Sequence, residues 1–283
     1  MKSGERGGKP MPRPLFCELS PFTYRISVMK CIIIRSVKNL LSGQRIARIK
    51  QADPLPFELY AHKSLIRRKL GNVAPELQEN KAVNLGIAAP KVTGILIRPG
   101  EVFSFWSLVG STSERKGYQK GLVINRGKTG SGIGGGMCQF TNLIHWLVLH
   151  SPLEIVEHHH HDGIDIFPDF GRQVPFGVGT SIVYNYLDYR FKNPTEATYQ
   201  LILYTTPDYL CGELRSDARS DFSYHIKVSD EFFSQEDDGI YRNGQIIRNM
   251  IDKRSGNVVK SELIKTNHAK ILYDASFVAE PRQ

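Results

Sequence analysis

Apolar residues recur with a helical period near the N-terminus of the chain. Between residues 24 and 49 they are spaced three or four residues apart, at Ile26, Met29, Ile33, Val37 and Leu40. Arg35, Lys38 and Arg45 fall away from that stripe. The spacing predicts an amphipathic basic helix. Its apolar stripe fits either the protein's own core, which is the commoner environment of such helices, or a membrane interface.

The central part of the chain changes from helical to alternating patterns. After Asp53-Pro54 we expect a second helical stretch that carries His62, Arg67 and Arg68. Short strands are expected over 92–97, 102–106 and 122–125, because apolar and polar residues alternate there between glycine and proline breaks. A helix is predicted from Met137 to Leu149, where Ser151-Pro152 closes it.

The rest of the chain is dominated by strand patterns. Strands are expected over 153–161, 181–186, 189–192 and 199–204, followed by hairpins with turns at Asn243-Gly244 and near 254–257. These elements predict an α+β fold with N-terminal helices, a central mixed α/β domain and a mostly antiparallel β C-terminal part. The expected parts are a flexible lead-in over 1–22, a basic helical region over 23–79, a core domain over 80–205 and a β-hairpin extension over 206–283.

The net charge of +9 is concentrated at the N-terminus. Residues 1–50 hold 11 Lys and Arg against 2 Asp and Glu, and the remaining residues balance at 26 against 26. A local basic arm favours weak contact of residues 24–50 with an anionic membrane and argues against a nucleic-acid partner. No apolar run approaches the roughly 20 residues of a spanning helix, and no signal peptide is recognised. We therefore expect a cytoplasmic protein, peripheral on the inner membrane leaflet.

A glycine-rich segment carries the sharpest chemical signal. Gly134, Gly135 and Gly136 directly precede Met137, Cys138 and Gln139 at the start of the expected helix. Glycine permits backbone conformations that expose amide groups, so this turn forms a candidate substrate or oxyanion loop. A thiol in the first helical turn lies at the positive end of the helix dipole, which predicts a lowered pKa for the Cys138 thiol. The segment lacks the Gly-Lys-Ser/Thr ending of a nucleotide-binding loop.

Four consecutive histidines, residues 158 to 161, follow on an expected strand. Alternation places His158 and His160 on one face and His159 and His161 on the other. A cysteine at a helix start, a histidine on a strand and an orienting carboxylate form the order used by papain-type thiol enzymes. Asp188, and after it Asp165, is the candidate for that carboxylate. No further ligand cluster accompanies the histidines, so we expect no metal and no cofactor.

Structural roles fit several of the same residues. Free cysteine is often a small buried hydrophobe, so a core thiol is as consistent with the sequence as a catalytic one. The four cysteines show no Cys-x-x-Cys spacing, which predicts reduced thiols. Phe103 and Trp106 are expected in the core or as one wall of a groove beside Cys138. His145 and His150 are interpreted as surface or packing residues.

Several motifs together resemble the VanW family. They are Arg98-Pro99-Gly100-Glu101, Phe103-Ser104-Phe105-Trp106, Gly117-Tyr118, the segment from Gly134 to Gln139, and the segment from Asp188 to Asn193. The resemblance is strong over about 80–205 and weak elsewhere. It implies an accessory role in resistance to vancomycin-type antibiotics and in peptidoglycan metabolism.

The resemblance also bears on the site. The family's histidine after the helix falls best on His161 and next on His159. Where relatives have Gly-x-Asp-Ala-Thr, this chain has Gly177-Val178-Gly179-Thr180-Ser181, which lacks the acid. Three functions follow as hypotheses: a cysteine-dependent amidase, peptidase or transpeptidase acting on peptidoglycan peptides, a non-catalytic module that binds a peptidoglycan peptide or lipid-linked precursor, and a structural partner of other resistance proteins.

Overall fold

A computed structural model describes residues 15–68, 74–125, 128–160, 163–169 and 173–278. The chain divides into two compact units, Met1–Gly43 and Gln44–Gln283. In the first unit a short 3-10 helix, η1 (Phe16–Glu18), precedes helix α1 (Pro21–Leu41). Residues of each unit contact mainly other residues of the same unit.

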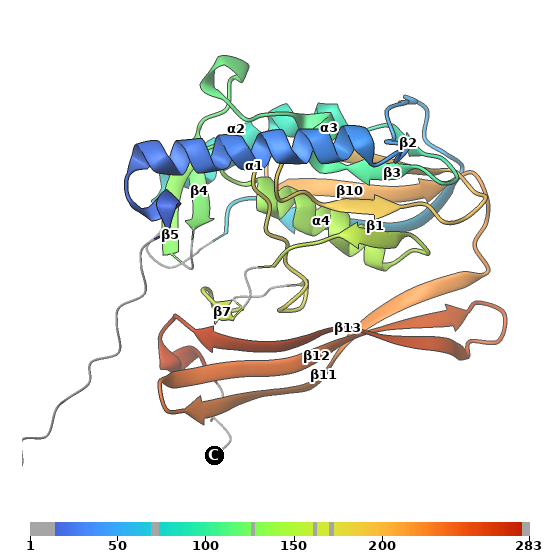
Figure 1. Cartoon of the computed structure of the whole chain (residues 1–283). Coiled ribbons are helices and arrows are strands. Elements are labelled where there is room, and N and C mark those ends of the chain that lie inside the picture. The colour runs from blue at the N-terminus through green and yellow to red at the C-terminus, as the bar shows by residue number, and fades with distance from the viewer. Residues whose placement is uncertain (1–14, 69–73, 126–127, 161–162, 170–172, 279–283) are drawn as a thin grey trace, which may run out of the picture. The chain divides into compact units, whose positions relative to one another are not determined.

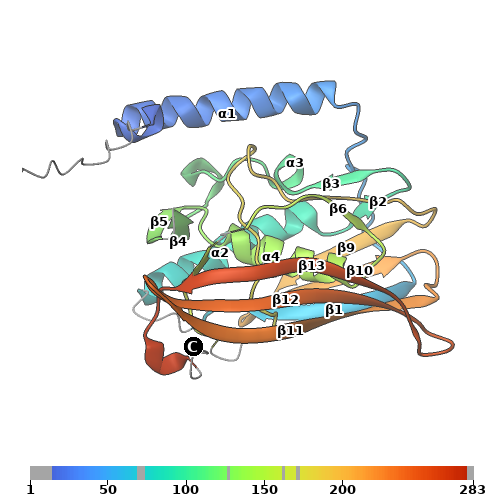
Figure 2. The ribbon, with the colours of Figure 1, turned by 60° about the horizontal axis from the view of Figure 1, so that its bottom comes forward.

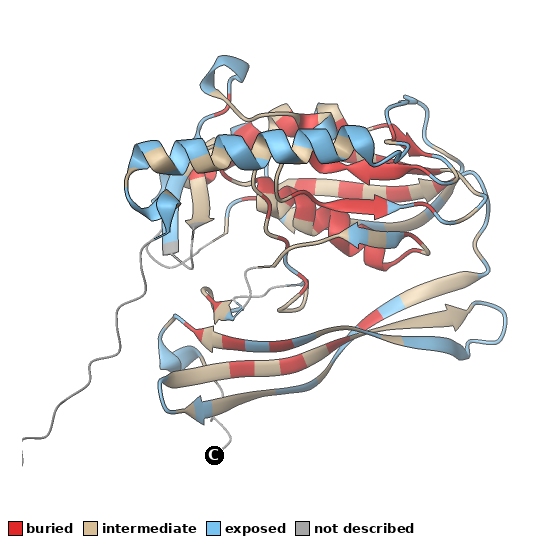
Figure 3. Cartoon of the chain, viewed as in Figure 1, coloured by how far each residue is buried: buried red, intermediate tan, exposed pale blue. Residues whose placement is uncertain are grey.

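Helix α1 begins and ends at local signals. The Ser20 hydroxyl accepts a hydrogen bond from the Thr23 amide, and Pro21 occupies the first helical position. Gly43 follows the helix at a positive φ of 63°, so α1 ends eight residues before the expected end at Ile49. None of the α1 residues is buried within its own unit (Figure 3).

The second unit is built on a four-stranded antiparallel sheet. Its strand order is β1-β10-β9-β2, from β1 (Phe57–Leu65), β10 (Tyr209–Ser216), β9 (Tyr199–Thr205) and β2 (Ile95–Ile97). Helix α2 (Pro75–Val92) contacts β9, and helix α4 (Met137–Leu149) contacts β10 and β1 (Figure 1). The main hydrophobic core fills the space between these helices and the sheet.

Smaller elements surround this core. A second sheet has the order β3-β8-β6, from β3 (Val102–Ser104), β8 (Arg190–Lys192) and β6 (Glu154–Glu157). Helix α3 (Phe105–Val109) follows β3 directly, and a 3-10 helix, η2 (Glu114–Lys116), leads to the hairpin of β4 (Lys120–Asn125) and β5 (Lys128–Ile133). The glycine turn before α4 directly follows strand β5 of this hairpin.

The C-terminal sheet has the order β11-β12-β13-β7. Its long strands β11 (Phe222–Glu236), β12 (Gly239–Asp252) and β13 (Val258–Ile271) run antiparallel side by side (Figure 2). Strand β7 (Ile164–Asp165) pairs parallel with β13. A 3-10 helix, η3 (Ala275–Phe277), follows. Ile226 and Ile246 from this sheet share a small core with Trp146 and Leu149 of α4. The predicted α+β fold with an antiparallel C-terminal part is confirmed.

Three local predictions were wrong. His62 lies in strand β1 and not in a helix, because Tyr60, His62 and Ser64 alternate with exposed neighbours and the strand pairs with β10. The segment 181–186 forms only an isolated bridge, between Val183 and Leu187. The β11–β12 turn lies at residues 237–238, since Glu236 pairs with Gly239, whereas Gly244 lies within β12 opposite a bulge in β11.

The expected helix over 137–149 and the hairpin turn near 254–257 are confirmed. Within the described part of the chain, no helix combines the length and apolar character needed to cross a membrane.

Candidate functional site

The glycine turn before α4 is a tightly packed backbone junction. Gly134 and Gly136 have positive φ angles of 77° and 107°, which favour glycine. A side chain at Gly135 would meet the backbone carbon of Gly121 at 2.3 Å. Asn84 of α2 donates to the Gly135 carbonyl at 2.9 Å and thereby ties the turn to the helix. The three glycines are therefore required by conformation and close approach.

The Cys138 thiol is half-buried and packs against the main core. Burial raises its pKa, and hydrogen bonds from the amides of Ile182 and of Cys138 itself oppose this shift without overcoming it. The expected lowering of the Cys138 pKa is thus not found. The reason is that desolvation of a thiolate outweighs the favourable helix terminus. No histidine contact of the sulfur appears among the described residues.

The histidines keep the alternation expected of an extended segment. The His158 ring lies 3.9 Å from the His160 ring and 4.1 Å from the ring of His145, which α4 supplies. His159 points the other way, where its Nε2 is 3.0 Å from Glu157 Oε1. His161, the first choice for the catalytic histidine, lies outside the described residues.

Burial keeps His158 and His145 neutral. It is the largest cause that lowers the pKa of His158 to about 3, with the neighbouring His160 next. His145 is fully buried, its pKa is also lowered well below the usual value by burial, and its Nδ1 lies 3.0 Å from the Tyr189 hydroxyl. The reading of His145 as a packing residue therefore agrees with its burial. His158 donates from Nε2 to the Gly179 carbonyl over 3.1 Å.

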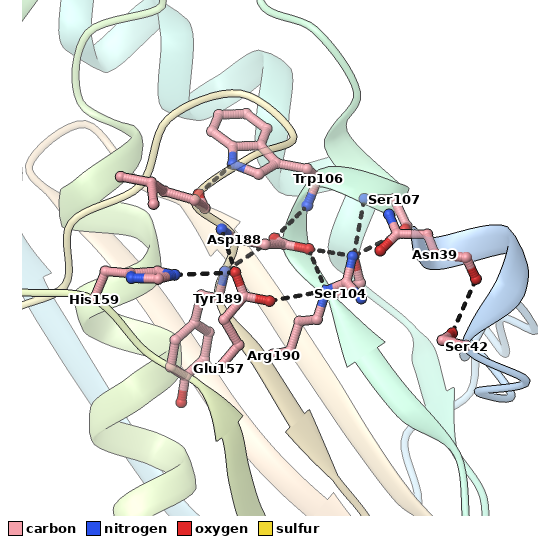
Figure 4. Close-up of polar contacts among 11 residues, drawn as sticks. Asn39, Ser42, Ser104, Trp106, Ser107, Glu157, His159, Asp188, Tyr189 and Arg190 are labelled. Carbon is pink, nitrogen blue, oxygen red and sulfur yellow. Dashed lines mark hydrogen bonds and ion pairs between the residues drawn. The ribbon is translucent and has the colours of Figure 1, made fainter. Parts of the chain in front are cut away.

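Asp188 is the centre of a buried network (Figure 4). Its carboxylate accepts from the Ser104 hydroxyl at 2.6 Å, the Trp106 amide at 3.1 Å and the Tyr189 amide at 2.9 Å. Arg190 Nε donates to the same carboxylate at 2.8 Å. These four donors join β3, α3 and β8, and none of them is a histidine.

Among the described residues, Glu157 links Asp188 to His159. The Asp188 amide donates to Glu157 Oε1 at 2.9 Å, the same oxygen that lies against His159 (Figure 4). Glu157 was not singled out in the sequence. Its place two residues before His159 on an alternating segment is the signal that pairs them. Asp165, the other candidate carboxylate, faces Arg242 and Tyr273 in the C-terminal sheet.

The remaining predicted site residues have packing or tethering contacts. Phe103 is fully buried and stacks on Phe191 at 4.7 Å, so it cannot line an open groove. Trp106 is 6% exposed, and its Nε1 donates to the Leu187 carbonyl. The Gln139 side chain donates to the Ser64 hydroxyl and the Leu65 carbonyl, which ties α4 to the end of β1.

Two polar residues on the buried face of α2 were not among the site residues predicted from the sequence. Lys81 is 5% exposed and its side chain crosses Gly136, while Gln78 is 7% exposed one turn earlier. Their signal was their position in the helical stripe that continues with Leu85, Ala88 and Val92. Among the residues whose placement is described, no group of three His, Cys, Asp or Glu side chains is arranged to hold a metal ion.

These features occur in a chain that belongs to the VanW family. The sequence model of the family, described as VanW like protein, matches residues 80–215, which span α2, the glycine turn, α4, the histidines and Asp188. Most of the core and the predicted site residues therefore lie within the segment that the family model matches.

Two relatives show how far the similarity extends. The vancomycin B-type resistance protein VanW of Enterococcus faecalis is 34% identical over 196 residues, which cover 69% of this chain and 71% of that protein. The uncharacterized protein YoaR of Bacillus subtilis is 28% identical over 142 residues, which cover 48% of this chain and 43% of that protein. No solved structure matches the chain significantly.

Proposed function

We propose that this chain is an accessory protein of glycopeptide resistance that binds peptidoglycan precursors without forming a covalent intermediate. The link to resistance rests on its relative from Enterococcus faecalis, which is named as a vancomycin B-type resistance protein. Peptidoglycan peptides and lipid-linked precursors are the ligand class, since vancomycin-type antibiotics act on cell-wall synthesis. A role as structural partner of other resistance proteins is the remaining alternative.

The environment of Cys138 carries the non-covalent part of this proposal. A nucleophilic thiol requires a lowered pKa or a base within hydrogen-bond reach. Here burial raises the Cys138 pKa, and the sulfur receives hydrogen bonds from backbone amides. At Gly179, where the resemblance to the family implies an acid, this chain offers only a backbone carbonyl to His158. Both observations weaken the constellation that a thiol enzyme needs.

The test is binding and adduct formation with soluble muropeptides. Wild type and Cys138→Ala should bind a muropeptide with the same affinity by calorimetry, and intact-mass spectrometry should detect no acyl adduct. A mass increase equal to an acyl group on wild type, lost in Cys138→Ala, would refute the proposal.

One observation favours a cysteine-dependent amidase, peptidase or transpeptidase as the second candidate. His159 Nε2 and Glu157 Oε1 lie 3.0 Å apart, as a general base and its orienting carboxylate would. The Ser181 amide donates to the His159 carbonyl, and the next residue, Ile182, contacts the Cys138 sulfur. This enzyme would lose muropeptide turnover in Cys138→Ala and His159→Ala but much less in His160→Ala, whose side chain faces away. The set also includes His161→Ala, because His161 was the first choice for the catalytic histidine.

A further inference from the structure

Lys81 is a largely buried lysine that has no counter-charge among the described residues. Lys81 is 5% exposed on the inner face of α2, and no hydrogen bond or ion pair of its Nζ occurs within the described segments. Burial and then the positive charges of Arg68 and Arg67 lower its pKa to about 8, and no carboxylate contributes. Lys81 therefore remains mostly charged at neutral pH. An isolated buried charge is costly unless a partner of opposite sign binds to it.

The Lys81 side chain is directed at the N-terminus of α4. A Cβ atom on Gly136, the N-cap of that helix, would lie 2.5 Å from Lys81 Cγ and 3.3 Å from Cδ. The amides of Gly136 and Met137 find no acceptor in the parts of the chain that the structure describes. A helix of 13 residues presents partial positive charge at this end. The lysine and the helix terminus thus contribute charge of the same sign.

A second unpartnered polar group lies on the buried face of α2. Gln78 precedes Lys81 by one helical turn and is 7% exposed, and neither its Nε2 nor its Oε1 has a hydrogen-bond partner among the described residues. Buried side-chain amides are nearly always hydrogen-bonded, so an orphaned one suggests that a ligand completes it. The missing Cβ of Gly136 leaves room for the aliphatic stem of Lys81 to cross the helix terminus.

We propose that Lys81, Gln78 and the amides of Gly136 and Met137 form a binding site for an oxyanion of the carboxylate or phosphate class. The ligand oxygens accept hydrogen bonds from the helix terminus and from the ammonium group, and the Gln78 amide adds a donor. This proposal deepens the proposed function and rests on it for the source of the anion. A peptidoglycan precursor carries both chemistries, a peptide carboxylate and, when lipid-linked, a pyrophosphate.

The experiment titrates the full chain with three probes. These are an N-acetylated D-alanyl-D-alanine peptide with a free carboxylate, the same peptide as its amide, and inorganic pyrophosphate. NMR amide resonances of Gly136 and Met137 should move on binding of the free carboxylate or of pyrophosphate, and not with the peptide amide. The anion that binds more tightly identifies the natural ligand group as either a peptide carboxylate or the pyrophosphate of a lipid-linked precursor. If neither anion moves these resonances at millimolar concentration, the site does not exist.

Matched variants separate the site from a general charge effect. Lys81→Met keeps the aliphatic stem over Gly136 and should weaken anion binding about 10- to 100-fold, as expected for a lost charge-assisted hydrogen bond. Lys91→Met is the matched control, because it also removes one positive charge from α2. Because Lys91 Nζ instead contacts Val109 and Tyr118, its loss should leave affinity unchanged. Equal weakening by both variants would overturn the proposal.

The two proposals fail in distinguishable ways. If muropeptides bind wild type and Lys81→Met equally, the anion site is refuted and the precursor-binding function stands. If pyrophosphate binds at Lys81 but no muropeptide or lipid-linked precursor binds anywhere, the anion site stands and the proposed function fails. Unliganded Lys81→Met should unfold at the same or a higher temperature, since it removes an uncompensated buried charge.

Discussion

Asp188→Asn should destabilise the fold strongly, because this carboxylate holds three elements together. The substitution keeps the shape of the side chain but turns one acceptor into a donor. If the new amide group takes the place of Oδ2, it faces Arg190 Nε, which now lies 2.8 Å from that oxygen. If the side chain flips, the amide group faces the backbone amides of Trp106 and Tyr189 instead. Either orientation leaves a buried donor unsatisfied.

The magnitude follows from the burial of the pair. The Asp188 and Arg190 side chains are 0% and 5% exposed, and the other carboxylate on Arg190, Glu157, is 3.5 Å away. Removing one member of a buried ion pair costs about 3–5 kcal/mol. At about 2–4 °C per kcal/mol for a chain of this size, the melting temperature should fall by roughly 6–20 °C.

The assay is thermal unfolding followed by circular dichroism, with Asp221→Asn as the control. Asp221 is exposed, and its carboxylate makes no hydrogen bond to a described residue, so the same change there should cost less than about 0.5 kcal/mol. If Asp188→Asn had the same melting temperature as Asp221→Asn, the network around Asp188 would not stabilise the fold. An intact fold with lost muropeptide turnover would instead support the predicted role of Asp188 as the carboxylate that orients a catalytic histidine.

Four further outcomes are expected. Gly135→Ala should destabilise by about 1–3 kcal/mol or more, since its Cβ meets the Gly121 backbone, whereas Gly179→Ala, with nothing within 4 Å, should be neutral in the same melts. Iodoacetamide should label the exposed Cys31 at neutral pH and native Cys138 only at higher pH, since burial raises the Cys138 pKa; mass mapping that finds Cys138 faster contradicts this. The pKa of His158 is about 3 in the fold against about 6.5 unfolded, so its contribution to stability is complete above pH 6.5 and declines as pH falls towards 3. Denaturation at pH 7 and 5 should show that decline, and His158→Gln should reduce it. Finally, residues 24–50 should bind anionic vesicles in a salt-sensitive way; equal sedimentation of a chain starting at Gln51 would contradict this.

Local sequence determined the elements whose signals lie within a few residues. Gly134 and Gly136, both at positive φ, place the start of α4 at Met137, and Ser151-Pro152 closes it. Alternation alone separates His159 from its neighbours His158 and His160. These features need no partner from elsewhere in the chain, because backbone conformation and side-chain direction are set by nearest neighbours.

Tertiary structure decided what those residues contact. Strand β1 looked helical until its pairing with β10, about 150 residues away, imposed a period of two. Asp188 is buried and fixed because Ser104 of β3 and Trp106 of α3 supply its donors from 84 and 82 positions away. Lys81 is buried because α2 packs on the glycine turn. Burial then reversed the expected pKa shift at Cys138, since desolvation depends on the atoms that surround a group and not on its place in the chain.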